Sequence, residues 1–261
     1  MFNFNNFYKH GFYRKLKIID KMNFKDLKPT DLSTINFVGY PKEQYFSGND
    51  DVYDKKQVCI HHTVSGPGIR GDIATWLSTT KRIATCIIID RDGTVNQLFS
   101  SKYWGAHLGA GKSSLDKHSI GVELDNWGGL ILGDGTVKQI GKNKDGSKKY
   151  IETVIGKYYA TYGNVIDVPV TEYSLGFRGY NFYESYPEAQ LRSLGSLLLL
   201  WNKRYSIPLT YNEDMWNVSQ RALSGIPGVW THVSYRPAPE KFDCHFQPEL
   251  ITLLKTLSTL T

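Results

Sequence analysis

The segment 58–63 reads Val-Cys-Ile-His-His-Thr, and it constrains the fold more than any other stretch of this 261-residue chain. Its three apolar residues favour a buried β-strand, and the strand runs directly into two histidines. An imidazole at the end of a buried strand is mounted on rigid backbone, which suits a metal ligand. Adjacent strand residues point to opposite faces, so His61 and His62 do not both reach one ion easily. Two incidental histidines are the alternative interpretation of the same residues.

A second set of polar residues far down the chain favours the metal interpretation. His232 ends a segment reading Val-Trp-Thr-His, and Lys241 and Asp243 follow in a loop. Zinc catalysis uses three His, Asp or Cys ligands and leaves one position open. His61 or His62 offers the first ligand, His232 the second and Asp243 the third. Lys241 lies two residues before Asp243, so both side chains point the same way in an extended loop, where the cation can stabilise an oxyanion.

A carboxylate inside an apolar strand completes this set. Residues 119–124 read Ser-Ile-Gly-Val-Glu-Leu and predict a strand whose single charged residue is Glu123. A carboxylate among such neighbours must face a polar cleft, a partner or solvent. Glu123 would then act as the general base that takes a proton from the attacking water. One base, one cation and an open zinc position are sufficient for amide hydrolysis.

The remaining pattern predicts an α/β or α+β fold with a central mixed sheet flanked by helices, because strands and helices interleave without an internal repeat. An Asp-Gly turn predicts a hairpin over residues 86–99. Asp72 fits an N-cap for a helix that ends near Lys81. Apolar periodicity predicts helices at 187–205 and around 250–257, and residues 229–233 predict a strand. Residues 128–185 indicate short hairpins and a long loop.

Charge and cysteine content limit the partners and the compartment. A net charge of +6 favours anionic partners, but no run of Lys and Arg is dense enough to select nucleic acid, so none is expected. Three cysteines predict no disulfide framework and favour folding in a reducing compartment. Residues 1–20 lack the apolar core of a signal peptide. The longest apolar run, residues 197–201, is too short to span a membrane.

These residues, in this order, resemble the zinc-dependent N-acetylmuramoyl-L-alanine amidases of the type-2 class. That class includes phage lysozyme-type amidases and animal peptidoglycan recognition proteins. The resemblance runs from about residue 40 to the C-terminus, and each motif alone is common. The matching pieces are Ile-His-His-Thr-Val-Ser at 60–65, Ile-Asp-Arg-Asp-Gly-Thr at 89–94, Ala-His-Leu-Gly at 106–109, Ser-Ile-Gly-Val-Glu-Leu at 119–124, Thr-His at 231–232 and Lys-Phe-Asp at 241–243.

The resemblance implies a function and a role for each matching residue. His61, His232 and Asp243 would hold Zn²⁺, Glu123 would be the catalytic glutamate, and Lys241 would polarise the carbonyl. The implied fold is a central mixed sheet with helices on its faces and a groove for the glycan-linked peptide. The bond cut would be the amide between the lactyl group of N-acetylmuramic acid and L-alanine of the stem peptide.

Two departures from the family pattern matter. The family usually places Pro after the third ligand, whereas Cys244 follows Asp243 here, and some relatives use cysteine as that ligand. Cys244 therefore stays an alternative to Asp243. Thr85 stands where some relatives carry a tyrosine that assists catalysis.

Three further residues are assigned to the substrate side of the site. We expect His107 to line the groove, with a purely structural loop histidine as an equal alternative. Trp104 could stack on sugar. His62, also assigned to this set, is expected to pack or hydrogen-bond behind the metal site.

The expected organisation is an N-terminal extension over residues 1–40, then one zinc amidase domain over 41–261 with an insertion at about 128–185. The expected partner is bacterial peptidoglycan, with no membrane span and a monomeric state. Without a signal peptide, we expect a phage-type lysin that stays cytoplasmic until host lysis, or a virion-associated enzyme. The alternatives are a peptidoglycan-binding module without catalysis and a zinc peptidase acting within the stem peptide. The complete set of ligands, base and cation argues against the first alternative.

Overall fold

A six-stranded mixed sheet forms the centre of the computed structural model, which describes residues 22–143 and 145–260. The strand order is β1-β4-β3-β5-β2-β13. Strands β3, β5, β2 and β13 run parallel to one another, and β4 is antiparallel to β3. The mixed sheet confirms the predicted fold class. The strands span Asn36–Phe37 (β1), Gln57–His62 (β2), Ile87–Ile89 (β3), Val95–Gln97 (β4), Ser119–Leu124 (β5) and Gly228–Thr231 (β13).

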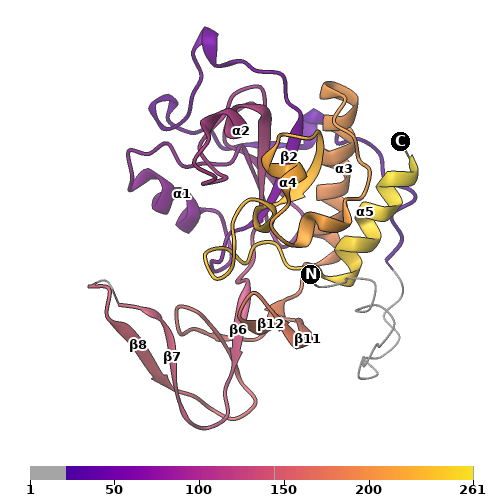
Figure 1. Ribbon diagram of the computed structural model, residues 1–261. Coiled ribbons are helices and arrows are strands. Elements are labelled where there is room, and N and C mark those ends of the chain that lie inside the picture. The colour runs from indigo at the N-terminus through magenta and orange to yellow at the C-terminus, as the bar shows by residue number, and fades with distance from the viewer. Residues whose placement is uncertain (1–21, 144, 261) are drawn as a thin grey trace.

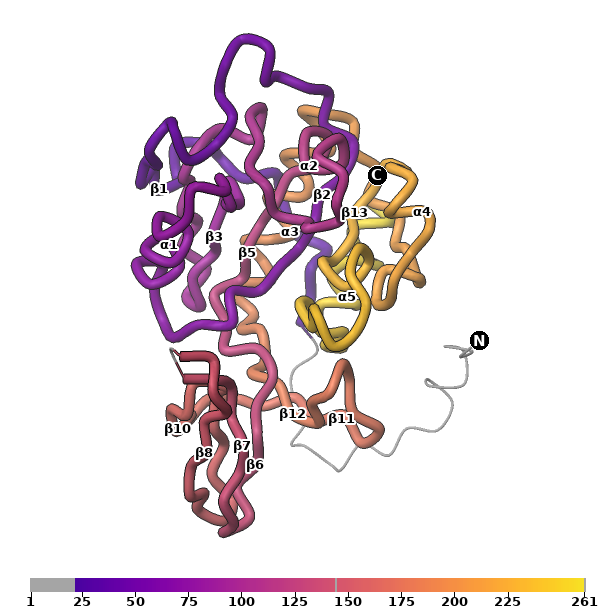
Figure 2. The backbone as a smooth tube through the Cα atoms, turned by 60° about the vertical axis from the view of Figure 1, so that its left-hand side comes forward, coloured from indigo at the N-terminus to yellow at the C-terminus, as the bar shows by residue number. Residues whose placement is uncertain are grey.

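Helices cover both faces of this sheet. The two longest, α3 and α5, lie on one side, and α1 and α2 lie on the other (Figures 1 and 2). Leucines at helical spacing along α3 and α5 are buried in the shared core, as an amphipathic pattern predicts. The helices span Arg70–Leu77 (α1), Ser113–His118 (α2), Glu188–Tyr205 (α3), Gln220–Leu223 (α4) and Pro248–Leu260 (α5), and 3-10 turns occur at Leu32–Thr34, Lys42–Gln44, Asn49–Asp51, Glu213–Trp216 and His232–Ser234.

Two predicted boundaries are wrong. Helix α1 begins at Arg70, so Asp72 is its third residue and not its N-cap. The Asp72 side chain is buried, and no side-chain hydrogen bond caps the start of this helix. Strand β13 ends at Thr231, because the next three residues form a 3-10 turn in which the Ser234 hydroxyl accepts a bond from the Thr231 amide. His232 therefore opens a turn at the end of the strand.

Residues 129–184 form a separate body, here called the β-lobe. The predicted short hairpins are present as β7–β8 and β11–β12, and the remaining residues add strands to a sheet instead of forming the predicted long loop. It projects from one end of the main sheet (Figures 1 and 2). Its five-stranded antiparallel sheet has the order β10-β9-β6-β12-β11, and β7 and β8 make a hairpin beside it. The chain leaves the main sheet after β5 and returns before α3. The strands span Gly129–Leu132 (β6), Val137–Lys142 (β7), Lys148–Glu152 (β8), Tyr158–Ala160 (β9), Val165–Ile166 (β10), Val170–Phe177 (β11) and Tyr180–Glu184 (β12).

A buried ion pair fastens the β-lobe where the chain returns to the main fold. Arg91 donates from Nε and Nη2 to the two carboxylate oxygens of Glu184, at 2.7 and 2.8 Å. Arg91 also pairs with Asp125 at 2.6 Å, and the Trp127 amide donates to Glu184. A bidentate arginine pair is among the stronger charged contacts in proteins, so this end of the lobe is held rigidly.

Residues 22–40 belong to the same fold. Phe24 is buried in the main core, and β1 pairs in parallel with β4. The first 21 residues of the expected extension lie outside the described residues. In the described ranges, no helix combines the length and apolar character needed to cross a membrane.

The three cysteines are all buried and none is disulfide-bonded. Cys59 lies on β2, Cys86 just before β3, and Cys244 before α5. Burial raises the pKa of each thiol, to about 12 for Cys86.

Candidate metal centre and active site

Strand register places the predicted site residues in one row. Parallel pairing sets His61 of β2 opposite Glu123 of β5. On the other side of β2, Ile60 pairs with Thr231, so His232 follows beside His61. Paired residues of neighbouring strands face the same side of a sheet. Three adjacent strands therefore present two imidazoles and one carboxyl group along a single edge.

Three side-chain atoms converge at this edge. The Nδ1 atoms of His61 and His232 lie 2.8 Å apart, and Asp243 Oδ2 lies 2.8 Å from His232 Nδ1 and 3.3 Å from His61 Nδ1. All three residues are buried. Tetrahedral zinc with ligands at roughly 2.0–2.1 Å has ligand–ligand edges of about 3.4 Å. The observed spacing is close to such an arrangement.

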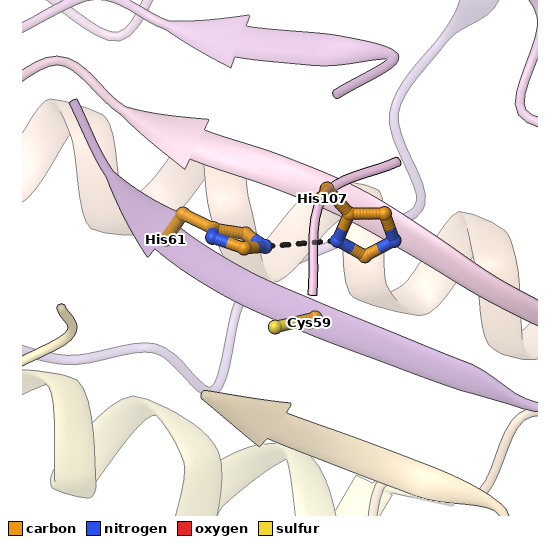
Figure 3. Close-up of side chains that lie close together, drawn as sticks. All are labelled: Cys59, His61 and His107. Atoms are coloured by element: carbon orange, nitrogen blue, oxygen red, sulfur yellow. Dashed lines mark hydrogen bonds between the residues drawn. The ribbon is translucent and has the colours of Figure 1, made fainter. Parts of the chain in front are cut away.

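The outer nitrogens of both histidines have hydrogen-bond partners. His232 Nε2 lies 3.0 Å from the carbonyl oxygen of Leu108, which can only accept, so Nε2 carries the hydrogen. His61 Nε2 lies 3.0 Å from His107 Nδ1 (Figure 3), and His107 Nε2 lies 2.6 Å from the Ser119 hydroxyl, which can donate or accept. The assignment that leaves His61 Nδ1 free for a metal has His61 donating to His107 and His107 donating to Ser119.

This assignment leaves unprotonated atoms facing one another. The Nδ1 atoms of His61 and His232 and the carboxylate of Asp243 are then three electron-pair donors with no proton between them. A cation at their centre removes that repulsion. The donor set, two neutral imidazoles and one carboxylate, suits Zn²⁺. The residues present therefore fit the metal that the sequence predicts.

The loop that carries these outer contacts is itself held by one carboxylate. Asp116 Oδ1, on α2, accepts hydrogen bonds from the backbone amides of His107 and Leu108, both at 2.9 Å. The same two residues hold the outer nitrogens of His61 and His232. Asp116 thereby positions both candidate histidine ligands through a single loop.

Burial and charge set the protonation states of the donors. Burial, followed by the neighbouring His232, lowers the pKa of His61 to about 3. Burial alone would raise the pKa of Asp243, but the interactions with His232 and His61 outweigh it and hold that pKa well below its usual value. A neutral imidazole and an ionised carboxylate are the forms that bind a metal.

Glu123 faces a cavity of about 170 Å³ next to this cluster. Its Oε2 atom is buried and has no hydrogen-bond partner among the described residues. Burial raises the pKa of Glu123 well above its usual value, and the charges of Asp243 and Asp72 add to the rise. The nearby Lys241 acts in the opposite direction. The cavity is lined by His61, His62, Thr63, Val64, Trp76, Ile83, Ala84, Thr85, His107, Glu123, His232, Lys241 and Asp243.

The predicted ligands, base and cation thus come together at one cavity. Of the three predicted substrate-side residues, His107 and His62 border this cavity and Trp104 does not. His107 lines the cavity and contacts His61. His62 also borders the cavity, but its Nδ1 lies 2.8 Å from the hydroxyl of Tyr186. Trp104 is buried and stacks on Phe46 at 3.7 Å.

A second group of potential ligands shares His61. Cys59, His61 and His107 also bring three ligand atoms within 4.8 Å of one another (Figure 3). In this group, His61 Nε2 and His107 Nδ1 already form the hydrogen bond that orients His61. Among the described residues, Cys244 belongs to neither group, and it packs in the core beside Tyr186. The geometry therefore brings Asp243, and not Cys244, to the two histidines.

Sequence reasoning missed the outer contacts of Leu108, Asp116 and Ser119. Leu108 contributes a backbone carbonyl, which leaves no trace in the sequence. Asp116 and Ser119 follow the loop by only 8 to 12 residues, but neither residue type marks such a role. Trp76 of α1 packs against the core and also borders the cavity.

A mixed sheet presents two buried histidines, an aspartate and a glutamate at one cavity. The family model described as N-acetylmuramoyl-L-alanine amidase matches residues 52–241, which is more than two thirds of the chain. The chain belongs to this family. No curated protein sequence matches this chain significantly.

Several solved structures are similar to this one. The structure of PlyL has a TM-score of 0.46 and 12% identity, covering 85% of this chain and 96% of that one. A selenomethionine derivative of AmpD has a TM-score of 0.44 and 15% identity, covering 87% and 98%. The Staphylococcus aureus hydrolase AmiA, in complex with its ligand, has a TM-score of 0.47 and 13% identity, covering 90% and 86%.

Proposed function

We propose that this protein hydrolyses the amide bond between N-acetylmuramic acid and L-alanine in bacterial peptidoglycan, with Zn²⁺ as its cofactor. The observation that carries the proposal is the convergence of His61 Nδ1, His232 Nδ1 and Asp243 Oδ2 beside the unpartnered carboxyl of Glu123. Family membership indicates the bond that is cut.

His61, His232 and Asp243 would hold the ion. When bound, Zn²⁺ would supply Lewis-acid polarisation of the scissile carbonyl and make the attacking water more acidic. The outer contacts to His107 and Leu108 orient the two imidazoles toward the ion's position. These residues therefore prepare the site before substrate enters.

Glu123 would move the protons of the reaction. Glu123 lines the cavity, and its carboxylate can take a proton from the attacking water, then give it to the departing amine of L-alanine. Burial raises the pKa of Glu123 from its usual acidic value toward the working pH, where a carboxyl group transfers protons more effectively. Lys241 borders the same cavity and would stabilise negative charge on the carbonyl oxygen.

We further propose that the protein acts on the cell wall as a monomeric, phage-type lysin, freed by host lysis or carried by the virion. The net charge of +6 favours binding to an anionic wall. In this proposal residues 41–261 form one catalytic domain, residues 22–40 complete its core and sheet, and the β-lobe is its insertion.

Mass spectrometry of purified peptidoglycan digested with and without a chelator tests the proposal. We expect free stem peptides with new L-alanine amino termini, lost on chelation and restored by zinc. The E123Q variant is the matched control, since it keeps the donor set and removes the base. Cleavage within the stem peptide would indicate a zinc peptidase instead. Binding to peptidoglycan without any product would indicate a recognition module.

A further inference from the structure

The loop that carries Lys241 makes few backbone hydrogen bonds of its own. Its Arg236 side chain also pairs with Glu240 within the loop and donates to the carbonyl of Gly109. Residues 235–242, here called the lysine loop, contain Pro237 and Pro239, which have no backbone N–H. Within the loop, the carbonyl of Pro237 accepts bonds from Glu240 and, at 3.4 Å, from Lys241. Irregular segments with few internal bonds are mobile unless other groups hold them. The position of the Lys241 side chain therefore depends on outside contacts.

One side chain of the β-lobe supplies such contacts. Arg178 Nη1 donates to the backbone carbonyls of Arg236 and Lys241, at 3.0 and 3.3 Å. Its Nη2 donates to the carbonyl of Val233 and to Asn217 Oδ1, both at 3.1 Å. The planar guanidinium thus holds both ends of the lysine loop and the turn after β13 with four bonds.

The backbone at Arg178 is in a conformation that arginine does not favour. Arg178 and Gly179 connect β11 to β12, and Arg178 has a φ of +49°. Glycine or asparagine suits such a turn position better. Strain of this kind at a single residue points to a role for its side chain. Here that side chain reaches the lysine loop.

A second contact joins the same two segments. Phe242, which follows Lys241, packs against Tyr180 of the β-lobe with ring centres 5.1 Å apart. Tyr180 lies so close over Gly129 that a β-carbon there would come within 2.4 Å of the ring. On its other side, Phe242 contacts His62 of β2, with ring centres 5.7 Å apart. The lysine loop is thus clamped between the lobe and the main sheet.

We propose that Arg178 is a positioning residue for Lys241, through which the β-lobe sets the rate of the catalysed reaction. The proposal rests on the amidase function proposed above. Arg178 does not line the cavity. Its loss would let the lysine loop move, so that the Lys241 charge is no longer held where negative charge develops.

Steady-state kinetics of the zinc-loaded protein on a soluble N-acetylmuramoyl-L-alanyl peptide tests this. R178N suits the turn but lacks the guanidinium group. R178G leaves space in which a free guanidinium ion can bind. R178K keeps the positive charge without the planar guanidinium group. We expect kcat of R178N and R178G to fall ~10–100-fold with little change in KM. R178K should be intermediate. R192Q is the control and should match wild type. It removes an arginine of α3 that bonds the Asn23 carbonyl and the Asp26 carboxylate.

Guanidinium chloride at non-denaturing concentration should restore part of the kcat of R178G, and sodium chloride at equal ionic strength should not. A wild-type kcat in R178N would overturn the proposal, as would a loss in R178G that guanidinium does not reverse. Should R178N fail to fold, the rescue of R178G decides.

The failure of the proposed function would be visible separately. If the wild-type protein releases no product, the amidase proposal fails, and hydrogen exchange of residues 233–243 in the zinc-loaded protein then tests Arg178 alone. Faster exchange in R178N than in wild type supports the positioning role. Equal exchange in the two proteins contradicts it.

Discussion

Replacing Asp116 by alanine tests how the candidate metal centre is held. Asp116 touches neither the cavity nor the three donor atoms. Its Oδ1 accepts the backbone amides of His107 and Leu108, and these two residues in turn hold the outer nitrogens of His61 and His232. D116A should therefore weaken zinc binding without removing a ligand.

The size of the effect follows from the bonds that are lost. Each buried N–H left without a partner costs about 1–3 kcal/mol, so the loop loses about 2–6 kcal/mol of preference for its present geometry. Part of this is recovered when the loop relaxes toward water. Changes to groups that orient metal ligands typically lower metal affinity about 10–100-fold, which corresponds to about 1.4–2.7 kcal/mol. We expect D116A to fall in that range.

Competition with a chromophoric zinc chelator measures the affinity, and D116N supplies the matched comparison. Both bonds use the single atom Oδ1, which asparagine retains as its carbonyl oxygen, so D116N should bind zinc nearly as tightly as wild type. D134N, a change in an exposed turn of the β-lobe, should have no effect. Wild-type affinity in D116A would refute the reasoning. If D116N were as weak as D116A, the charge and not the hydrogen bonds would be responsible.

Three further predictions concern the base, the packing under the site and pH. E123Q should lower kcat ~10²–10⁴-fold while equilibrium dialysis still finds bound zinc. In G121A, the new β-carbon would lie 2.7 Å from Thr85 Cγ2 and 3.0 Å from the ring of His107, so we expect a loss of about 1–3 kcal/mol in the free energy of unfolding together with weaker zinc binding. Burial lowers the pKa of Lys55 from 10.5 to about 8. Below pH 8 Lys55 is charged in both the folded and the unfolded protein, so the cost of burying the charge applies in full. Between pH 8 and 10.5 only the unfolded chain keeps the proton, so the folded protein gains stability as the pH rises through this window. Urea unfolding below, within and above this window should show the wild type gaining stability relative to K55M, and parallel curves would contradict the assignment.

The elements that the sequence predicts well are long and strongly patterned. Helix α3 spans 18 residues and carries buried leucines at helical spacing, and strand β5 has Glu123 as its one charged residue. The Asp-Gly turn correctly predicts the β3–β4 hairpin. His61 and Glu123 meet because parallel strands end at the same edge of the sheet, so a list of likely donors was enough to indicate the place of the site.

The sequence pattern does not predict the five-stranded sheet of the β-lobe. Strand β7 is exposed at most positions, so it lacks the alternation that identifies a half-buried strand. Strand β6 pairs with β12, about fifty residues further along, and no local signal specifies such a pairing. For the same reason Arg178 reads as an ordinary hairpin arginine, since its four acceptors are brought near it only by tertiary packing.

The burial of all three cysteines gives the folded protein no reactive thiol on its surface. Oxidants and alkylating reagents attack the thiolate, and burial raises the pKa of each of these thiols, so that form is scarce as well as inaccessible. Modification then requires the chain to open. Cys86 lies in the core and outside the candidate site. The rate at which a thiol reagent labels it would therefore measure how often the main sheet opens.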